Sequence, residues 1–239
     1  MKIFFSFLIL LLFTKLYGQS QGPYAGSSSS NTVISGSTST TKNGNNAYAS
    51  DNSYATNTTN LSSTGNYSDY LVISGFGFSI PAGSTINGIE VVVERSDPNG
   101  KIKDNIIAVV KSGTIGSTNK ASSSFWPTTD GTITYGNNAD LWGTAWTETD
   151  INSSAFGVAL SWKRNGGGAS TAFANIDLVT VAVYYTAPLP IELVRFTALP
   201  VHKYVKLEWE TASEINTEQF IVERSSDLET TEAVAALPA

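Results

Sequence analysis

The sequence predicts an all-β fold, a jelly-roll or β-sandwich domain followed by a shorter β segment. Short runs rich in Val, Ile, Thr and Tyr recur along the chain, and clusters of Gly, Asn and Pro separate them. Ile89, Val91 and Val93 occupy alternate positions, which is the period of a half-buried strand. No stretch long enough for a helix shows convincing helical periodicity. Many short strands divided by turns are typical of a sandwich or a jelly roll.

Residues 1–18 have the composition of a secretory signal peptide. Lys2 gives the positive start, residues 3–13 are apolar except for Ser6, and Leu16 and Gly18 stand where a small-residue cleavage site needs them. The apolar run is shorter than the roughly 20 residues that a membrane-spanning helix needs. We therefore expect a secreted protein, extracellular or on the outer cell surface, whose mature chain begins at Gln19 and has no membrane span.

The segment after the signal peptide is rich in Ser, Thr and Asn. We predict residues 19–44 as a lead-in, flexible over 27–31, because so polar a stretch buries little apolar surface. Interleaved Tyr side chains further on favour short edge strands and polar loops. The jelly-roll-like β-sandwich is expected over residues 45–186.

The strands of this domain follow from the apolar runs and the turns between them. Pro81, Gly83 and the Asp97–Gly100 run mark turns, and Gly166–Gly168 marks a loop. The expected strands cover residues 70–78, 89–94, 106–110, 132–135, 156–162 and 178–185.

The chain changes character at residues 187–190, where Ala-Pro-Leu-Pro is predicted as a stiff linker. Beyond it, strands are expected at 192–198, 204–209 and 220–224. Three strands cannot close a sandwich, which needs about seven. Residues 191–239 are therefore predicted to be an incomplete β domain that folds poorly by itself.

Composition excludes several classes of protein. The 239 residues include 14 Lys and Arg against 20 Asp and Glu, a formal net charge of −6, with one His and no Cys. Without Cys, disulfides, thiol nucleophiles and Cys-ligated metals are excluded, and one His cannot build a multi-histidine metal site. An acidic chain poor in Lys and Arg does not suit nucleic acid, whose binding depends on neutralising phosphates.

The tail resembles a known kind of domain. Its matching segments resemble the fibronectin type III-like domain near the C-terminus of proteins exported by the type IX secretion system of Bacteroidetes. The resemblance implies a secreted surface protein whose domain continues past Ala239 and is followed by a sorting domain, so we expect that the sequence is truncated or that the sorting signal lies elsewhere. The matching segments are Leu189–Leu193, Phe196–Ala198, Val205–Trp209, Thr211–Asn216 and Phe220–Ser225.

The first domain resembles another recurrent module. Its matching segments are similar to a jelly-roll-type module of secreted bacterial proteins and phage structural proteins, which has no assigned activity. The resemblance implies a fold and no mechanism. The matching segments are Asn46–Asp51, Gly75–Pro81, Ile86–Val91, Asp140–Gly143, Trp146–Thr147, Asp150–Ser153 and Phe156–Val158.

Few residues suit catalysis. His202, the one imidazole, stands in a turn of the tail, a poor place for a Ser–His–Asp arrangement. Glu90 and Glu94 lie about 13 Å apart along one strand, farther than two-carboxylate glycoside hydrolysis allows. Glu148 and Asp150 are closer, but we expect Asp150 to cap a turn. We predict a non-enzymatic protein without catalytic residues; the alternative is a fragment of a glycan-active hydrolase that uses a carboxylate pair.

Aromatic residues supply the candidate ligand-binding site. Exposed aromatic faces stack on sugar rings, so Trp126, Tyr135, Trp142 and Trp146 are candidates for binding a glycan. The alternative is that these rings anchor loops of the fold. Trp162 continues an apolar alternation and is assigned to the core.

A calcium site is the one metal site that the sequence suggests. Asp97, Asn99 and Asp104 bracket a turn, and calcium prefers carboxylate and carbonyl oxygens in loops. Their spacing is not that of an EF-hand, and the alternative is that these residues form the turn. No other cofactor is expected.

These observations predict a secreted, non-enzymatic module of the cell surface. Its expected role is structural, adhesive or glycan-binding. The expected partner is a polysaccharide or a surface protein.

Overall fold

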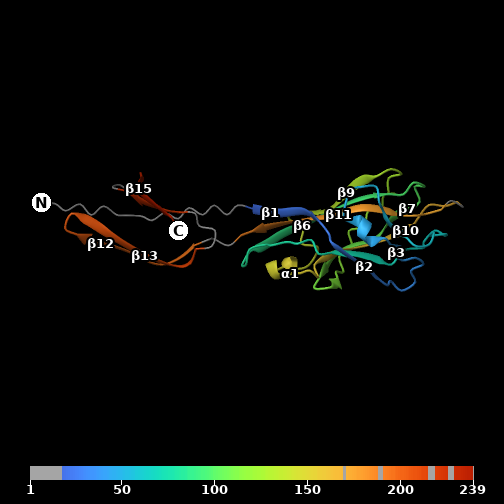
Figure 1. The fold of residues 1–239 in the computed structure, drawn as a ribbon, viewed down its shortest axis with the longest axis horizontal. Coiled ribbons are helices and arrows are strands. Elements are labelled where there is room, and N and C mark those ends of the chain that lie inside the picture. Colours follow the sequence, from blue (N-terminus) through green and yellow to red (C-terminus); the bar gives the residue numbers. More distant parts are fainter. Residues whose placement is uncertain (1–17, 169–170, 188–190, 215–218, 226–228, 239) are drawn as a thin grey trace. The chain divides into compact units, whose positions relative to one another are not determined.

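A computed structural model describes residues 18–168, 171–187, 191–214, 219–225 and 229–238. The all-β class is confirmed, since strands form nearly all of the regular structure in these ranges. Gly18–Ala187 is one compact unit, called here the sandwich unit, and the strands after it belong to another, the tail unit (Figure 1). No helix in the described ranges is long and apolar enough to cross a membrane. The predicted signal peptide, apart from Gly18, and residues 188–190 of the predicted linker lie outside the described residues.

One sheet of the sandwich unit has six strands, and its pairings are antiparallel. Two long strands, β6 and β11, form its centre, and β1 pairs with β11 off the main path. The main path runs β3 (Thr41–Lys42), β4 (Ala55–Asn57), β11 (Asn175–Thr186), β6 (Thr85–Ser96) and β9 (Gly131–Asn137), and β1 covers Gly18–Ala25.

The other sheet has five strands, also antiparallel. Its central strand, β10, pairs with β5 on one side and β7 on the other. The order is β2 (Ser28–Thr32), β5 (Tyr70–Ser74), β10 (Gly157–Arg164), β7 (Ile102–Lys111) and β8 (Thr114–Ile115). The two helical elements described are short, η1 (Gly44–Ala47) and α1 (Glu148–Asn152).

The two sheets enclose one hydrophobic core. Ile89, Val91 and Val93 of β6 are completely buried, while the residues that alternate with them, Glu90, Val92 and Glu94, are half-buried, so the predicted alternation is confirmed. Side chains of the five-stranded sheet belong to the same core cluster, among them Leu71, Ile73, Ile107, Val109, Val158, Leu160 and the fully buried Trp162.

The expectation of a flexible lead-in is wrong. Residues 19–44 contain β1, β2 and β3, and β2 covers most of the stretch expected to be flexible. β2 finds its partner in β5, about forty residues further on, where Ser30 lies opposite Val72. Polar side chains add local bonds: the Asn31 amide donates to the Thr41 carbonyl oxygen (2.9 Å). Sheet pairing and these bonds order a segment that buries little apolar surface.

The tail unit consists of two hairpins in the described ranges. β12 (Ile191–Val201) pairs with β13 (Tyr204–Glu214), and β14 (Gln219–Arg224) pairs with β15 (Glu232–Pro238). The three expected strands are present and longer, and β15 was not expected. The rings of Trp209 and Phe220 lie 5.7 Å apart between their centroids, so the hairpins contact each other.

Candidate functional site

The four aromatic residues expected to bind a glycan lie in the core of the sandwich unit. Trp126, Tyr135, Trp142 and Trp146 expose only 3, 4, 2 and 7% of their surface. The expectation of an exposed stacking platform is therefore wrong for these rings. Each polar atom on them also forms a hydrogen bond inside the protein. Trp142 Nε1 donates to the Ile89 carbonyl (2.9 Å), and Trp146 Nε1 donates to the Leu141 carbonyl (2.9 Å).

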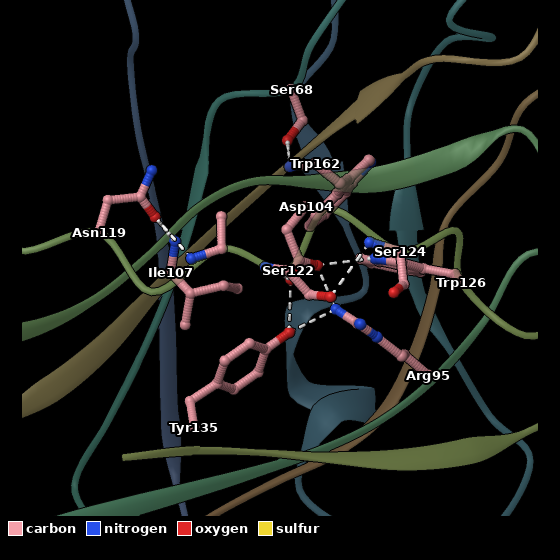
Figure 2. Close-up of polar contacts among 11 residues, drawn as sticks. Ser68, Arg95, Asp104, Ile107, Asn119, Ser122, Ser124, Trp126, Tyr135 and Trp162 are labelled. Atoms are coloured by element: carbon pink, nitrogen blue, oxygen red, sulfur yellow. Dashed lines mark hydrogen bonds and ion pairs between the residues drawn. The ribbon is translucent and has the colours of Figure 1, made fainter.

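Two of these rings belong to a buried polar network that joins the two sheets (Figure 2). Arg95 of β6 forms an ion pair with Asp104 of β7, and both side chains are almost completely buried. Asp104 Oδ1 also accepts from Trp126 Nε1 (2.8 Å), and Asp104 Oδ2 accepts from the Tyr135 hydroxyl (2.7 Å) and the Ser122 N–H (2.7 Å). A buried ion pair is tolerated only when bonds of this kind offset its desolvation.

The network also fixes the state of the tyrosine. Burial, and next the Asp104 carboxylate, raise the pKa of Tyr135 far above its ordinary value, against the opposing effect of Arg95. Tyr135 therefore stays a phenol that accepts from Arg95 Nη1 (2.5 Å) while donating to Asp104. The Arg95 guanidinium lies 4.7 Å from the centroid of the Trp126 ring, an attractive cation–π contact. These residues link the two sheets and have a structural role.

The same contacts overturn the calcium hypothesis for Asp97, Asn99 and Asp104. Asp97 accepts from the backbone N–H groups of Asn99 (3.1 Å), Lys101 and Ile102 (2.8 Å), which builds the turn between β6 and β7. Asn99 donates its side-chain amide to Thr171 Oγ1 (3.1 Å), and Asp104 already faces Arg95. Among the described residues, no group of three or more acidic, His or Cys side chains could hold a metal ion.

The residues weighed for catalysis are dispersed. His202 lies exposed in the turn between β12 and β13. Asp150 caps α1 in a reciprocal capping box with Thr147, as expected of a turn-capping residue, and its Oδ2 lies 3.0 Å from Lys111 Nζ. Glu90 and Glu94 lie on one strand, β6. The two candidate carboxylate pairs thus lie on separate elements, Glu90 and Glu94 on β6 and Glu148 and Asp150 on α1.

A hollow of about 450 Å³, called the indole hollow, lies beside β7 and β8. Trp142 and Trp146 line it, together with the hydroxyl-bearing Thr114 and Thr144. Because both indoles are nearly buried, they offer a ligand in this hollow only a small part of their surface. Of the four residues predicted to bind a glycan, Trp142 and Trp146 lie at this hollow, where they form part of its wall.

Lysine side chains hold the loop that carries these two indoles. Lys111 Nζ donates to the Ala145 carbonyl (2.7 Å), and Lys120 Nζ lies 2.6 Å from Asp140 Oδ2. Trp142 itself has a φ of 55°, a left-handed backbone that a bulky residue seldom adopts. Its N–H donates to Asp140 Oδ1 (2.9 Å), which helps to hold that conformation. Strained backbone of this kind recurs at binding sites.

A second hollow of about 340 Å³, called the lysine hollow, borders the polar network, with Asp104 and Ser122 in its wall. Its wall includes Lys103 and Asn105 of β7, Lys163 of β10, and Asn165. Sequence reasoning missed this site, because neither lysine belongs to a motif. The β7–β10 register that places the lysines together could not be read from spacing.

Comparisons with known proteins give little further information. No protein-family model matches the chain, and no curated protein matches it. Among solved structures it is similar to the crystal structure of beta-1,2-glucanase from Parabacteroides distasonis, at 13% identity and a TM-score of 0.29. The match covers 93% of this chain and 31% of that one, so the chain spans about a third of that protein's length. At this TM-score the likeness carries no argument about function.

Proposed function

We propose that this chain is a secreted, non-enzymatic module of the cell surface that binds a glycan through its sandwich unit. The indole hollow carries this proposal. It combines the indoles of Trp142 and Trp146 with the exposed residues Thr114 and Thr144, a mixed lining that suits the apolar faces and hydroxyl groups of a sugar. Lys111, which also lines the hollow, and the nearby Lys120 and Asp140 hold the loop.

The test uses the hydroxyl groups on the rim, since truncating a buried indole would disturb the fold. The chain is titrated with a panel of neutral polysaccharides and oligosaccharides by isothermal titration calorimetry. The double variant Thr114→Ala, Thr144→Ala should weaken binding about thirtyfold, because two lost hydrogen bonds at about 1 kcal/mol each amount to about 2 kcal/mol. The matched control, Thr132→Ala with Thr134→Ala, removes two exposed hydroxyl groups of β9 and should leave binding unchanged.

A structural or protein-adhesive role is the second candidate. The deep burial of the four predicted aromatic residues favours it, since rings that pack the core do not present a stacking face. Absence of binding to every glycan tested would make this role the leading account. The hydrolase alternative is checked in the same samples: release of new reducing ends from any polysaccharide would contradict the non-enzymatic proposal.

Export by the type IX secretion system is part of the same proposal. It rests on the composition of residues 1–18 and on the tail's resemblance to fibronectin type III-like segments. Mass spectrometry of the exported protein should find an N-terminus at Gln19. An intact N-terminus on protein recovered outside the cell would contradict the predicted cleavage.

A further inference from the structure

The lysine hollow contains an unusual cross-strand pair. Lys103 of β7 lies directly opposite Lys163 of β10 in the antiparallel ladder, and residues so paired project to the same face. Like charges in this position destabilise a sheet. Neither lysine forms an ion pair within 4.0 Å in the described part of the chain. A local conflict of this kind points to a functional site.

Asp104, the acidic residue in the wall of the hollow, does not neutralise the charges of the two lysines. Asp104 has a completely buried side chain, and its charge is paired with Arg95 on the inner side. Its two oxygens also accept from Trp126, Tyr135 and the Ser122 N–H. The other side chains of the wall are neutral, so the hollow is positively charged on a chain whose net charge is negative.

The neutral part of the wall offers amide and hydroxyl groups. Asn105, Ser122, Ser123 and Asn165 contribute to it. A register shift in the β7–β10 ladder leaves Asn105 without a residue opposite it, and its Nδ2 donates to Ser161 Oγ (3.1 Å). Bulges often re-aim side chains next to functional sites. Beside the wall, Phe125 exposes 46% of its surface, and Lys103 Nζ lies 4.2 Å from its ring centroid. Lysines, amides, hydroxyls and one aromatic ring together suit an anionic sugar.

We propose that the lysine hollow binds the carboxylate or sulfate group of an acidic polysaccharide. The anion lies between the ammonium groups of Lys103 and Lys163 and removes their repulsion, while Asn and Ser side chains bond to sugar hydroxyls. This proposal rests on the proposed glycan-binding function and adds a ligand class to it. An acidic peptide fits less well, because the hollow has almost no aliphatic lining, with Ala121 as the exception.

The experiment is a calorimetric titration of the chain with oligogalacturonate, dextran sulfate, neutral dextran and poly-glutamate. We expect saturable binding of oligogalacturonate or dextran sulfate, with the tighter ligand identifying the anion as carboxylate or sulfate. Lys163→Gln and Lys103→Gln should each weaken binding at least tenfold. The matched control, Lys42→Gln, removes an exposed lysine of β3 on the other sheet and should bind as the parent does. Binding should also weaken as salt rises, since exposed charges are screened.

Thermal unfolding without ligand separates a binding role from a structural one. Because Lys163→Gln removes a like-charge pair, the variant should unfold at the same or a higher temperature than the parent. A variant that loses binding and also melts at a lower temperature would indicate that Lys163 is structural, and would overturn the proposal.

Three other results would reject the lysine hollow as the site of an acidic glycan, and each would still show whether the proposed glycan-binding function holds. Binding of neutral glycans without acidic ones would keep that function and reject the lysine hollow. Binding of acidic glycans that both Lys→Gln variants retain would place the ligand elsewhere. Poly-glutamate binding as tightly as the acidic glycans would reject the sugar assignment. Failure of every glycan, neutral and acidic, would remove both proposals.

Discussion

The sandwich unit and the tail unit use the same strand-forming residues, but they differ in what covers them. Val91 and Val181 of the sandwich unit are completely buried, whereas Tyr204 and Val205 of the tail unit expose 65 and 56% of their surface. β6 has a neighbour on each side and a second sheet across its face, while β13 has β12 as its partner in a two-stranded sheet. Strand propensity thus produces strands in both units, but burial requires further partners.

The ion pairs of the two units also differ in burial. The Arg95–Asp104 pair in the sandwich unit is shielded from solvent by two sheets. The ion pairs described in the tail unit are exposed, such as Arg224–Glu232, in which both side chains expose more than half of their surface. An exposed pair contributes about 0–1 kcal/mol, whereas breaking a buried one costs several times more. The comparison therefore predicts that substitutions of equal chemistry differ sharply between the units.

The largest effect is expected for Asp104→Ala. Arg95 would remain buried without its counter-ion, which costs about 3–5 kcal/mol. The free energy of unfolding, measured by urea denaturation of the chain, should fall by that amount. Glu208→Ala, which removes the exposed partner of Lys206 in the tail unit, is the matched control and should change little. Equal effects of the two substitutions would break the comparison.

A slightly smaller effect is expected for an apolar truncation. Ile89→Ala leaves a cavity at a completely buried position of β6 and should cost about 2–5 kcal/mol. Leu199→Ala in β12 removes a side chain that is 50% exposed and should change the free energy of unfolding by about 0.5 kcal/mol or less. A large loss on Leu199→Ala would show that this face of the tail unit is covered in solution.

Hydrogen exchange tests the comparison without substitution. Amides of β6 should exchange through global opening, while amides of β13 over Val205–Trp209 should exchange much faster, because a two-stranded ribbon opens locally. Mass spectrometry or NMR of the intact chain measures both regions in one sample. Protection across Val205–Trp209 equal to that of β6 would mean that the tail unit is as cooperative as the sandwich.

The smallest effect concerns alkaline pH. The hydrogen bond to Asp130, with burial and that carboxylate's charge, raises the pKa of Tyr54 to about 12. A folded-state pKa above the unfolded value near 10 contributes stability that is complete below pH 10 and is lost as pH rises toward 12. The melting temperature of the parent should therefore fall more steeply over this range than that of Tyr54→Phe. Parallel curves for the two proteins would show that the hydroxyl contributes nothing.

Local features of the sequence determined the class and the positions of the main strands. The alternation at Ile89, Val91 and Val93 marks the core face of β6, and the turn residues at Asp97–Gly100 mark where β6 ends and β7 begins. Trp162 was correctly assigned to the core. These features could be predicted because a strand's period and a turn's residue preferences are properties of neighbouring residues.

Only the tertiary structure decided what the conspicuous side chains do. The sequence assigned Trp126 and Tyr135 to a sugar platform and Asp104 to a calcium site. In the structure all three meet around Arg95, because β6, β7 and β9 bring Arg95, Asp104 and Tyr135 together and the loop before β9 adds Trp126. The Ser-rich β2 became ordered for the same reason, through pairing with β5. Register between distant strands also sets Lys103 opposite Lys163. Spacing along the sequence does not by itself give the register between distant strands. That register depends on which faces of the strands pack into the core that the two sheets share.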